Sequence, residues 1–399
     1  MLASLAVWGF KSLQQVEVAL GDVNVFIGAN GSGKSNLLEA IGFVSTIAEG
    51  RLDDQALARR GVRTSTPTLY QSAFAKIQPV PEIRMQTRFD ASDCQLDYTL
   101  RLHTEADARE QPWQYRETRI VRDPDSQAVI YELDAGIPGM FTAPSLPDGE
   151  SGRRIEDAIK TRTEVLADYA VFAPNTPTLR GMEPDIKQRA PVGLAGGQLA
   201  EAVKELLTPR RGKFGELDID DLLELLDWVD EIAVVPPSRD LTSASVPTSR
   251  SIIRFTDRWM GKGHNHISAY DASEGALYVL FALVLALHPK APRLFAIENL
   301  DQNMHPRLAR ATVRLFCNLM LKAQPPRQAL LTTHSPLVLD GLDLRNDRIR
   351  LFTVGRNAHG ATRIERVQVS AEILAAVDGG LALSNLWTMG RLGGVPDLF

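Results

Sequence analysis

The chain has 399 residues, of which 44% are hydrophobic and 23% are charged, close to the averages of globular proteins. This composition excludes disordered, collagen-like and fibrous proteins, and the length leads us to expect about two or three domains. The net charge of -5 provides no general attraction to a polyanion, so contact with nucleic acid would need a local basic patch or a partner. Two cysteines, Cys94 and Cys317, are too few for a disulfide framework and lack zinc-site spacing, which predicts a reducing compartment.

The sequence predicts no membrane segment. No run reaches the ~18 apolar residues of a membrane span, and the longest, over 275–287, is followed at once by His288 and Pro289. The N-terminal segment is apolar, but no basic region precedes it and Lys11 follows too soon for a secretory signal. We therefore interpret it as a first strand and expect a soluble, cytoplasmic protein without membrane contact.

The first third of the chain predicts strands, one helix and a set of hairpins. β-branched residues predict strands over 2–8, 16–20 and 23–27, and a Gly-rich turn then leads into a predicted helix over 34–48. Short alternating runs between residues 66 and 135 predict antiparallel hairpins.

The periodicity becomes helical after the Pro-, Gly- and Ser-rich stretch 136–152. Helices are predicted over 155–166, 199–207 and 219–229, before a polar linker over 236–250. Strands and helices then alternate, with strands predicted at 251–255, 266–270, 293–297 and 328–332 and helices at 274–287 and 306–321. No helical segment keeps a heptad long enough for a coiled-coil arm.

This order predicts an α/β fold whose mixed or parallel core sheet is assembled from both ends of the chain. An antiparallel β subdomain and a helical lobe are expected as insertions. We assign residues 1–65 and 251–399 to the two parts of the core, 66–150 to the β subdomain and 151–250 to the helical lobe.

Residues 28–35, Gly-Ala-Asn-Gly-Ser-Gly-Lys-Ser, match the phosphate-binding pattern G-x-x-x-x-G-K-[ST] between a predicted strand and a predicted helix. In such a loop the backbone N–H groups form an anion nest, the lysine reaches the β- and γ-phosphates and the serine hydroxyl ligates Mg²⁺. We therefore predict binding of ATP or GTP with Mg²⁺ as the cofactor. The predicted nucleotide-binding residues are Asn30, Gly31, Ser32, Gly33, Lys34, Ser35 and Asn36, with Ser35 also on the metal.

A phosphate-binding loop also needs an acid at the end of a neighbouring strand to hold Mg²⁺. The strand 293–297 ends at Glu298, which we predict for this role. Asn299 stands where a second acid would polarise the attacking water. An amide orients water but cannot accept its proton, and loss of a general base slows a reaction by on the order of 10²–10⁴. Asp301 is either a substitute base or a residue of the subunit boundary, and whether the chain is an ATP hydrolase stays open.

With these residues in place, the chain resembles the RecF/SMC/OLD-type ATPases of the ABC superfamily, a group often called AAA-family or AAA-21 ATPases. The resemblance covers nearly the whole chain and implies a P-loop NTPase head of ABC type that uses ATP. The matching segments are Gly9-Phe10-Lys11-Ser12, Gly28 to Asn36, Ser273-Glu274-Gly275, Leu294 to Pro306, Leu331 to Pro336, Leu386 to Gly390 and Gly393 to Pro396.

The resemblance implies that Ser273 and Gly275 form the ABC signature, which contacts the γ-phosphate held by the other subunit of a dimer. A helix N-terminus with a serine hydroxyl suits an anion, although Ser273 also fits a plain N-cap. The resemblance also implies that His334 is the switch histidine, which would bond the γ-phosphate or the water. The stretch 194–198, Leu-Ala-Gly-Gly-Gln, looks more like a signature by its letters, but it lies too far before Glu298, and we interpret it as a loop before a helix.

Three further residues fit the family less specifically. His305 matches it, although the proline that follows explains the position as a helix start. Gln71 and Gln78 are candidates for the family's Q-loop glutamine, and both also fit ordinary surface positions.

Three departures from the family's pattern limit the function. The acid after Glu298 is replaced by Asn299, coiled-coil arms are absent, and the 65 residues after His334 are too few for the Toprim nuclease domain of OLD-type nucleases. The resemblance implies the sensor ATPase of a two-component antiphage defence system. That sensor is a homodimer or an oligomer of dimers that couples ATP binding, and slow hydrolysis, to a separate effector such as a nuclease.

Two alternatives stay open. If Asn299 blocks hydrolysis, the protein is an ATP-gated scaffold rather than an enzyme. A RecF-like DNA repair protein would instead bind duplex DNA directly, through basic clusters such as 59–63 and 210–213. The nucleotide-binding subunit of a membrane transporter is disfavoured because the inserted lobes are large.

Overall fold

The computed structural model describes residues 1–90, 94–104, 113–135, 149–208, 211–247 and 249–392 of the chain. Its central sheet has six strands in the order β18-β17-β3-β16-β15-β8. The strands from β17 to β8 are parallel, and β18 pairs antiparallel with β17 at one edge. These strands are β3 (Val23–Ile27), β8 (Ala170–Phe172), β15 (Leu294–Ile297), β16 (Gln328–Thr333), β17 (Ile349–Arg356) and β18 (Thr362–Arg366).

Parallel pairing brings the ends of three strands that are distant in sequence to one edge of this sheet. Ile27 at the end of β3 pairs with Thr333 at the end of β16, and β15 ends beside them. The segments that follow these strands contain the Gly-rich loop, Glu298 and His334. This is the edge at which open parallel sheets bind their ligands.

The segment 151–250, which we expected to be a helical lobe, contributes strands as well as helices. Strand β8 is an edge strand of the central sheet and pairs with β15. The predicted helix over 219–229 ends at Leu225, because the chain turns into a strand at Val229. Strands of two or three residues are too short to show a period of two, so the sequence did not reveal them. The other short strands are β9 (Leu207–Thr208), β10 (Lys213–Phe214) and β11 (Leu217–Asp218), whereas β12 (Val229–Val235) has seven residues and begins where the predicted helix was expected to end.

A second six-stranded sheet, antiparallel throughout, has the order β2-β1-β4-β5-β6-β7. It confirms the predicted hairpins, and alternate residues of β4 are buried as the pattern requires. The first two strands of the chain pair within this sheet rather than with the parallel one. Its strands are β1 (Leu2–Phe10), β2 (Leu13–Ala19), β4 (Ile83–Asp90), β5 (Gln95–Thr104), β6 (Trp113–Arg122) and β7 (Val129–Ala135).

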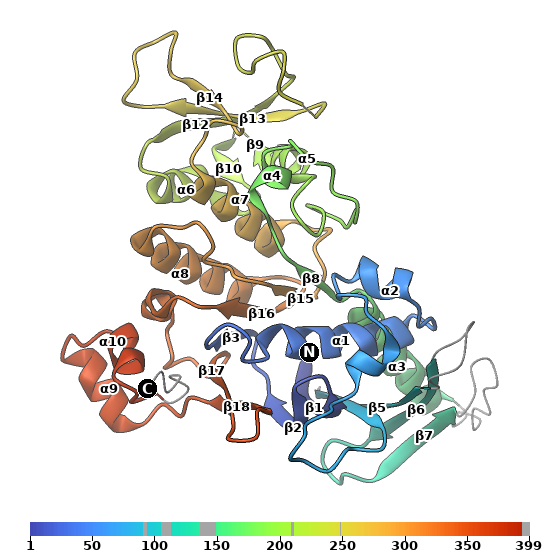
Figure 1. Cartoon of the computed structure of the whole chain (residues 1–399). Coiled ribbons are helices and arrows are strands. Elements are labelled where there is room, and N and C mark those ends of the chain that lie inside the picture. Colours follow the sequence, from blue (N-terminus) through green and yellow to red (C-terminus); the bar gives the residue numbers. More distant parts are fainter. Residues whose placement is uncertain (91–93, 105–112, 136–148, 209–210, 248, 393–399) are drawn as a thin grey trace.

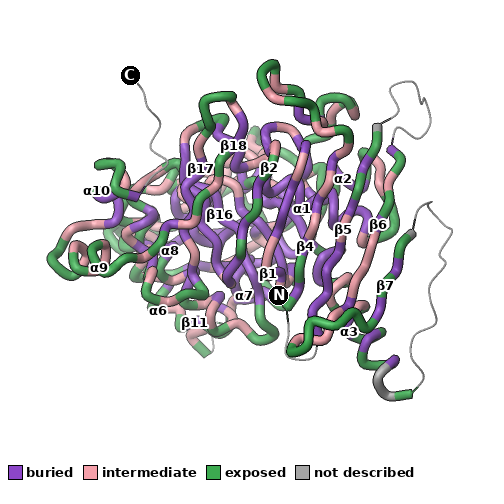
Figure 2. The backbone as a smooth tube through the Cα atoms, turned by 90° about the horizontal axis from the view of Figure 1, so that it is seen from below, coloured by how far each residue is buried: buried purple, intermediate pink, exposed green. Residues whose placement is uncertain are grey.

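Helix α1 (Lys34–Ala48) lies between the two large sheets, and Figure 2 shows its path through the buried interior. It is buried on nearly all sides, as expected for a helix without a polar face. Alternate residues of β3 point to opposite faces of the parallel sheet. Val25 packs in the core that contains α7 and α8, whereas Phe26 packs in the core that contains α1. The ring of Phe26 stacks on the ring of Phe352, with 4.8 Å between the ring centroids.

The other face of the parallel sheet is covered by α7 (Glu274–Leu287) and α8 (Pro306–Lys322), which confirm two predicted helices. Beyond them lie α5 (Leu199–Leu206), α6 (Ile219–Leu225) and a three-stranded sheet of β12, β13 (Ile252–Asp257) and β14 (His266–Ser268), seen at the top of Figure 1. We call these elements, together with α7 and α8, the upper lobe. Helix α7 is apolar all round and fully enclosed.

The remaining helices are short or lie at the periphery. None of the helices in the described ranges is both long enough and apolar enough to cross a bilayer. They are α2 (Asp54–Arg59), α3 (Glu150–Ala167), α4 (Thr176–Leu179), α9 (Ala371–Asp378) and α10 (Leu383–Thr388), with 3₁₀ turns over Pro67–Tyr70 and Pro336–Gly341.

The side chain of Gln328 links the two large sheets. Its Oε1 accepts from the Leu2 backbone N–H (3.0 Å), and its Nε2 donates to the carbonyls of Leu2 and Gly21 (both 2.7 Å), all out of solvent. When one partner of a buried hydrogen bond is removed, the other group stays buried without a partner, which lowers stability by about 1–3 kcal/mol per group.

We expect Gln328→Leu to lower the free energy of unfolding by about 2–4 kcal/mol, because the Leu2 and Gly21 backbone groups lose their partner. The measurement is urea denaturation followed by circular dichroism. Gln188→Leu, at an exposed loop position, should change stability by less than about 0.5 kcal/mol. Equal shifts in the two variants would contradict the role given to Gln328.

Candidate nucleotide-binding site

The Gly-rich loop connects the end of β3 to the first residue of α1, as predicted. Gly31 (φ 74) and Gly33 (φ 110) adopt left-handed conformations that side chains disfavour. A Cβ on Gly28 would lie 2.0 Å from the carbonyl oxygen of Val354. A left-handed glycine loop that opens a helix is the backbone arrangement that cradles phosphate.

Hydrogen bonds from distant strands brace this loop. The Thr362 hydroxyl donates to the carbonyl of Ser32 (2.7 Å) and lies 2.7 Å from the Ser12 hydroxyl. Asn36, on the first turn of α1, donates its amide to the same Ser12 hydroxyl (2.7 Å). The predicted residue Asn36 therefore supports the loop, and Ser12 belongs to the Gly9–Ser12 segment that carried the family resemblance.

Two residues of this network were not identified from the sequence. Thr362 lies on β18, and Arg356 at the end of β17 donates its Nε to the Gly31 carbonyl (2.8 Å). The positions lie some 330 residues after the loop and match no pattern. The only signal was the strand character of their segments, so only the folded sheet could place them beside the loop.

Lys34 is buried and turned back over its own loop. Its Nζ donates to the carbonyls of Gly28 (2.7 Å) and Ala29 (2.9 Å). Burial lowers the pKa of the Lys34 ammonium to about 8, against the opposing effect of the Glu298 and Asp301 carboxylates. The side chain thus carries a positive charge at neutral pH in a place where an anion is needed to compensate it.

His334 follows β16 and lies beside Lys34. Its Nδ1 lies 3.2 Å from the Lys34 Nζ and 3.2 Å from the Gly28 carbonyl. Burial and then the charge of Lys34 lower the pKa of His334, so the ring is neutral at pH 7. Nδ1 can accept from the Lys34 ammonium or donate to the Gly28 carbonyl, and the tautomer of the ring decides which of the two bonds forms.

The polar residues after β15 complete the site. The Glu298 N–H donates to the Phe172 carbonyl of β8 (2.8 Å), and the Asn299 N–H donates to the Thr332 hydroxyl (3.0 Å). Asn299 has φ 51, a left-handed value that asparagine tolerates better than most residues. Both Glu298 and Asp301 act on the pKa of Lys34 and of His334, which places the four groups within electrostatic reach of one another.

Two buried polar atoms in this region have no hydrogen-bond partner among the described residues, namely the Ser32 Oγ and the Asp301 Oδ1. Buried polar atoms are normally bonded. The Ser32 hydroxyl can donate to a phosphate oxygen, whereas the Asp301 carboxylate oxygen is an acceptor and suits a water molecule or a cation. Magnesium keeps several waters and needs only one or two protein ligands beside the phosphates. The Ser35 hydroxyl, half-buried on the first turn of α1, and the Glu298 carboxylate are the groups available for it.

Ser273 and Gly275 lie on the upper lobe at the start of α7. Ser273 is exposed and occupies the N-cap position of α7, as expected, but its side chain makes no capping hydrogen bond. Gly275 is buried: a Cβ there would lie 3.0 Å from the Leu308 side chain and 3.3 Å from the Asn303 carbonyl. Gly275 therefore has a packing reason within its own chain.

The look-alike segment over 194–198 precedes α5, as predicted for a loop before a helix. The Asp185 Oδ2 accepts from the N–H groups of Ala195 (2.9 Å) and Gly197 (3.3 Å), and a Cβ on Gly193 would lie 2.2 Å from it. The chain's own carboxylate thus occupies the anion nest that this loop forms.

The less specific candidates have structural partners. Gln71 donates its amide to the Val80 carbonyl (2.9 Å), and the carbonyl of the exposed Gln78 accepts from Gln14 (3.2 Å). The His305 side chain caps α8 through the Arg307 N–H, which accounts for that residue without a ligand. The segment Gly393 to Pro396 lies outside the described residues.

Comparison with known proteins identifies the group to which the site belongs. A family model described as "AAA domain, putative AbiEii toxin, Type IV TA system" matches residues 23–138 and 165–340. The DNA replication and repair protein RecF of Clavibacter sepedonicus is 41% identical over 63 residues, 15% of either chain. RecF of Frankia alni is 42% identical over 87 residues, 20% of this chain and 23% of that protein. The matches thus span less than a quarter of these relatives.

Solved structures of SMC heads also match. One is the SMC head domain from Thermotoga maritima, with 14% identity, a TM-score of 0.44 and coverage of 92% of this chain and 99% of that chain. Another is the Smc head domain with an extended coiled coil bound to the C-terminal domain of ScpA from Pyrococcus furiosus. It has 12% identity, a TM-score of 0.46 and coverage of 95% and 98% of the two chains.

The position of Lys34 predicts how nucleotide affinity depends on pH. Below about pH 8 the ammonium is charged, and above it the charge is lost. We expect the affinity for ATP, measured with a fluorescent analogue, to fall about five- to tenfold between pH 7.5 and 9. In Lys34→Arg the affinity should be lower but nearly independent of pH, because a guanidinium stays charged. Parallel pH profiles of the two proteins would show that Lys34 does not supply the binding charge.

Proposed function

This chain belongs to the AAA-domain family whose model it matches and is, as predicted, a RecF/SMC-like ATPase of the ABC superfamily. We propose that it binds ATP between two copies of itself and that the ATP-dependent closure of this dimer controls a separate effector protein. The observation that carries the proposal is the convergence of Lys34, His334 and the Glu298–Asp301 segment on the glycine loop. Three distant parts of the chain build one anion site there.

Each polar group has a role that follows from its position. The loop N–H groups and the Lys34 ammonium bind the phosphates, for which Lys34 exchanges its bonds to the two loop carbonyls. Ser35 and Glu298 hold Mg²⁺, which neutralises charge on the phosphates when bound. His334 hydrogen-bonds the γ-phosphate or the attacking water.

Closure of a dimer is supported by Ser273. This hydroxyl is exposed at the N-terminus of a 14-residue helix and makes no capping bond in its own chain. A helix N-terminus attracts anions, and Ser273 is free to bind the γ-phosphate held by a second copy. ATP bound between the copies then holds them together, and its nucleotide state sets the shape of the pair.

We expect Ser273→Arg to weaken ATP-dependent dimer formation at least about tenfold. The affinity of the monomer for ATP should change less than about twofold. Sedimentation velocity with and without ATP measures the first property, and a fluorescent ATP analogue measures the second. Ser245→Arg, exposed in the upper lobe, is the matched control. A dimer that still forms on ATP addition in Ser273→Arg would exclude the sandwich.

The residue after Glu298 supports slow hydrolysis. An amide at Asn299 cannot take a proton from water, and the buried Asp301 carboxylate is the nearest alternative base along the chain. Binding and closure do not need that base. The protein is therefore better suited to hold an ATP-bound state than to turn ATP over rapidly.

We expect Asn299→Glu to raise ATP turnover by at least about tenfold, since a general base contributes on the order of 10²–10⁴. Glutamate at φ 51 costs about 1–2 kcal/mol, so Asn299→Asp, which suits this backbone, is the control for strain. A radiolabelled ATP assay measures both. Brisk turnover in the wild type that neither substitution changes would contradict slow hydrolysis.

The effector is proposed to be a separate protein such as a nuclease, in a defence system against phage. What supports this is the family resemblance together with the toxin and Type IV TA system in the description of the matched family. The site itself provides a nucleotide-dependent switch for any such effector.

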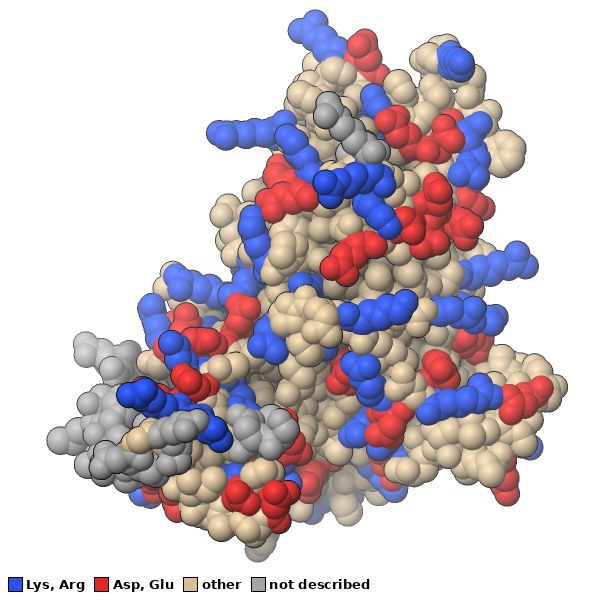
Figure 3. All heavy atoms as spheres, turned by 180° about the vertical axis from the view of Figure 1, so that it is seen from behind, with Lys and Arg blue, Asp and Glu red and all other residues tan. Residues whose placement is uncertain are grey.

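Direct binding of duplex DNA is the alternative that the RecF relatives favour. The cluster at 59–63 offers little to it, because Arg60 is buried and bonded to Glu49 (2.8 Å) and Arg63 pairs with Glu39 (2.6 Å). Arg210 of the second cluster lies outside the described residues. On the face shown in Figure 3, basic and acidic side chains are interspersed. Control of an effector therefore remains the proposal with more support.

A further inference from the structure

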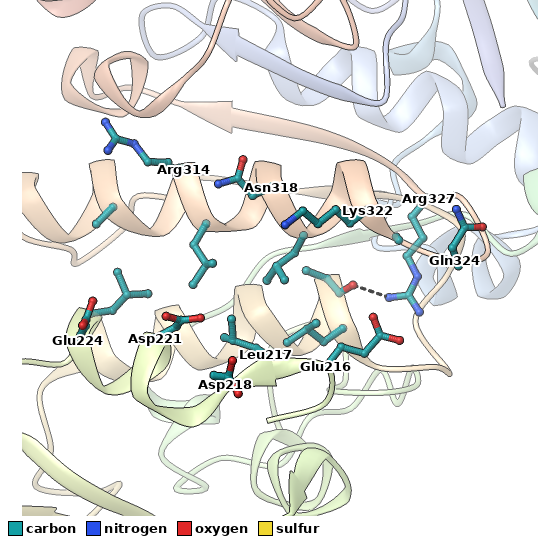
Figure 4. A pocket seen from close by; sticks show the side chains of 17 residues that line it. Glu216, Leu217, Asp218, Asp221, Glu224, Arg314, Asn318, Lys322, Gln324 and Arg327 are labelled. Atoms are coloured by element: carbon teal, nitrogen blue, oxygen red, sulfur yellow. Dashed lines mark hydrogen bonds between the residues drawn. The ribbon is translucent and has the colours of Figure 1, made fainter. Parts of the chain in front are cut away.

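A groove runs through the upper lobe between α8 on one side and α6 with β11 on the other (Figure 4). The C-terminal end of α7 forms its floor. Its volume is about 680 Å³, within the ~300–1,000 Å³ typical of binding pockets. We call it the α6–α8 groove. It takes part in none of the contacts of the nucleotide site.

Helix α8 contributes one complete face to the α6–α8 groove. Its lining residues recur at 311, 314, 315, 318, 319 and 322, the spacing of one face of a helix. The face extends over about 16 Å, or three turns. Leu315 and Leu319 on this face, and Leu287 from α7, are partly exposed. The groove is therefore an elongated channel between two helices, with leucines along its length and polar side chains beside them.

The two walls of the α6–α8 groove carry opposite charges. Glu216, Asp218, Asp221 and Glu224 stand on the α6 side, and Arg314 and Lys322 on the α8 side (Figure 4). No ion pair joins the two walls among the residues that the structure describes. Asp218 pairs with Lys213 on its own side.

Arg327 closes one end of the groove and is held in place by three hydrogen bonds. Arg327 is buried and donates to the carbonyls of Leu285 (3.1 Å), Ala286 (2.9 Å) and His288 (2.6 Å) at the end of α7. Its charge compensates the C-terminal end of that helix. Arg327 is thus a structural cap rather than a free ligand for an occupant.

We propose that the α6–α8 groove binds an amphipathic helix of a partner protein. The apolar row of this helix lies on Leu315, Leu319 and Leu287. A basic row on one flank faces the carboxylates of the α6 wall, and an acidic row on the other flank faces Arg314 and Lys322. A helix laid in an apolar groove is a common mode of peptide recognition, and the two charged walls set which helices fit.

The shape and chemistry of the groove favour a helix over a small molecule. Small-molecule sites have a few polar groups that converge inside an apolar pocket. Here the charged groups stand along both rims, and no lining side chain within the described ranges has a buried polar atom without a partner. An occupant as long as three turns of α8 matches the open face.

Helix α7 links the groove to the proposed dimer contact at Ser273. It starts next to Ser273 and ends in the groove floor at Ala286 and Leu287, about 21 Å along a helix that is buried over most of its length. This deepens the proposed function, on which it rests for its consequence: the effector would bind at the end of α7 remote from the shared ATP. The binding of the helix itself does not depend on ATP.

Three synthetic peptides test the groove, all with the same apolar row of leucines at helical spacing. One has a lysine flank and a glutamate flank, one has lysine on both flanks and one has glutamate on both. We expect the full-length protein to bind the mixed peptide about tenfold more tightly than either uniform peptide, because each uniform peptide meets one wall of its own charge. Fluorescence anisotropy of labelled peptides gives the affinities.

A charge reversal on one wall provides the matched test. In Arg314→Glu the new carboxylate and Lys322 cancel on the α8 wall, so the preference for the mixed peptide over the all-lysine peptide should disappear. Arg310→Glu changes the same residue type on an exposed position of α8 outside the groove, and it should leave the preference as in the wild type. Leu319→Arg should remove binding of all three peptides.

The outcomes separate this proposal from the nucleotide-dependent function. Absence of peptide binding, or equal responses of the Arg314 and Arg310 variants, would overturn the groove even if ATP binding and dimer formation are normal. A change of oligomeric state in Leu319→Arg without ATP would show that a second copy of this chain fills the groove, and would also overturn the proposal. Loss of ATP-dependent dimers with normal peptide binding would refute only the proposed function.

Discussion

The parallel pairing of β3, β16 and β15 is the constraint on which the site depends. Each strand ends at the same edge of the sheet, so the glycine loop, His334 and Glu298 start from fixed positions side by side. Helix α1 is enclosed between the two large sheets and cannot shift without opening a core. The loop between β3 and α1 is therefore held at both ends by buried structure.

Within this frame Lys34 carries a buried positive charge that no carboxylate of the described residues contacts directly. Lys34 is buried and bonded only to neutral carbonyls and to His334, while the carboxylates that act on its pKa make no ion pair with it in the described structure. A buried charge without a counter-ion is unfavourable. Binding of a triphosphate relieves this, which is why the apo geometry already indicates the chemistry of its ligand.

Helix α7 joins the two contacts proposed for the upper lobe. It carries Ser273 at one end and forms the floor of the α6–α8 groove at the other, and it is buried over most of its length. A rigid helix transmits a displacement with little loss, because close-packed cores deform poorly. The loop over 194–198 shows the opposite case: its anion nest is filled by Asp185, so a sequence that resembles a signature serves only the packing of the lobe.

The sequence by itself determined the phosphate-binding loop, the strand and helix on either side of it, and the roles proposed for Lys34 and Glu298. These depend on local patterns, namely glycine spacing, periodicity and residues at strand ends, which do not need distant contacts. The role proposed for His334 came from the family resemblance. Only the tertiary structure decided that β8 joins the parallel sheet, that Thr362 and Arg356 brace the loop, and that the cations of 59–63 are largely engaged. It also decided that Asn299 is left-handed and that two charged walls form a groove. Each of these results from residues that are far apart along the chain and meet only when the sheets pack, so no local pattern records them.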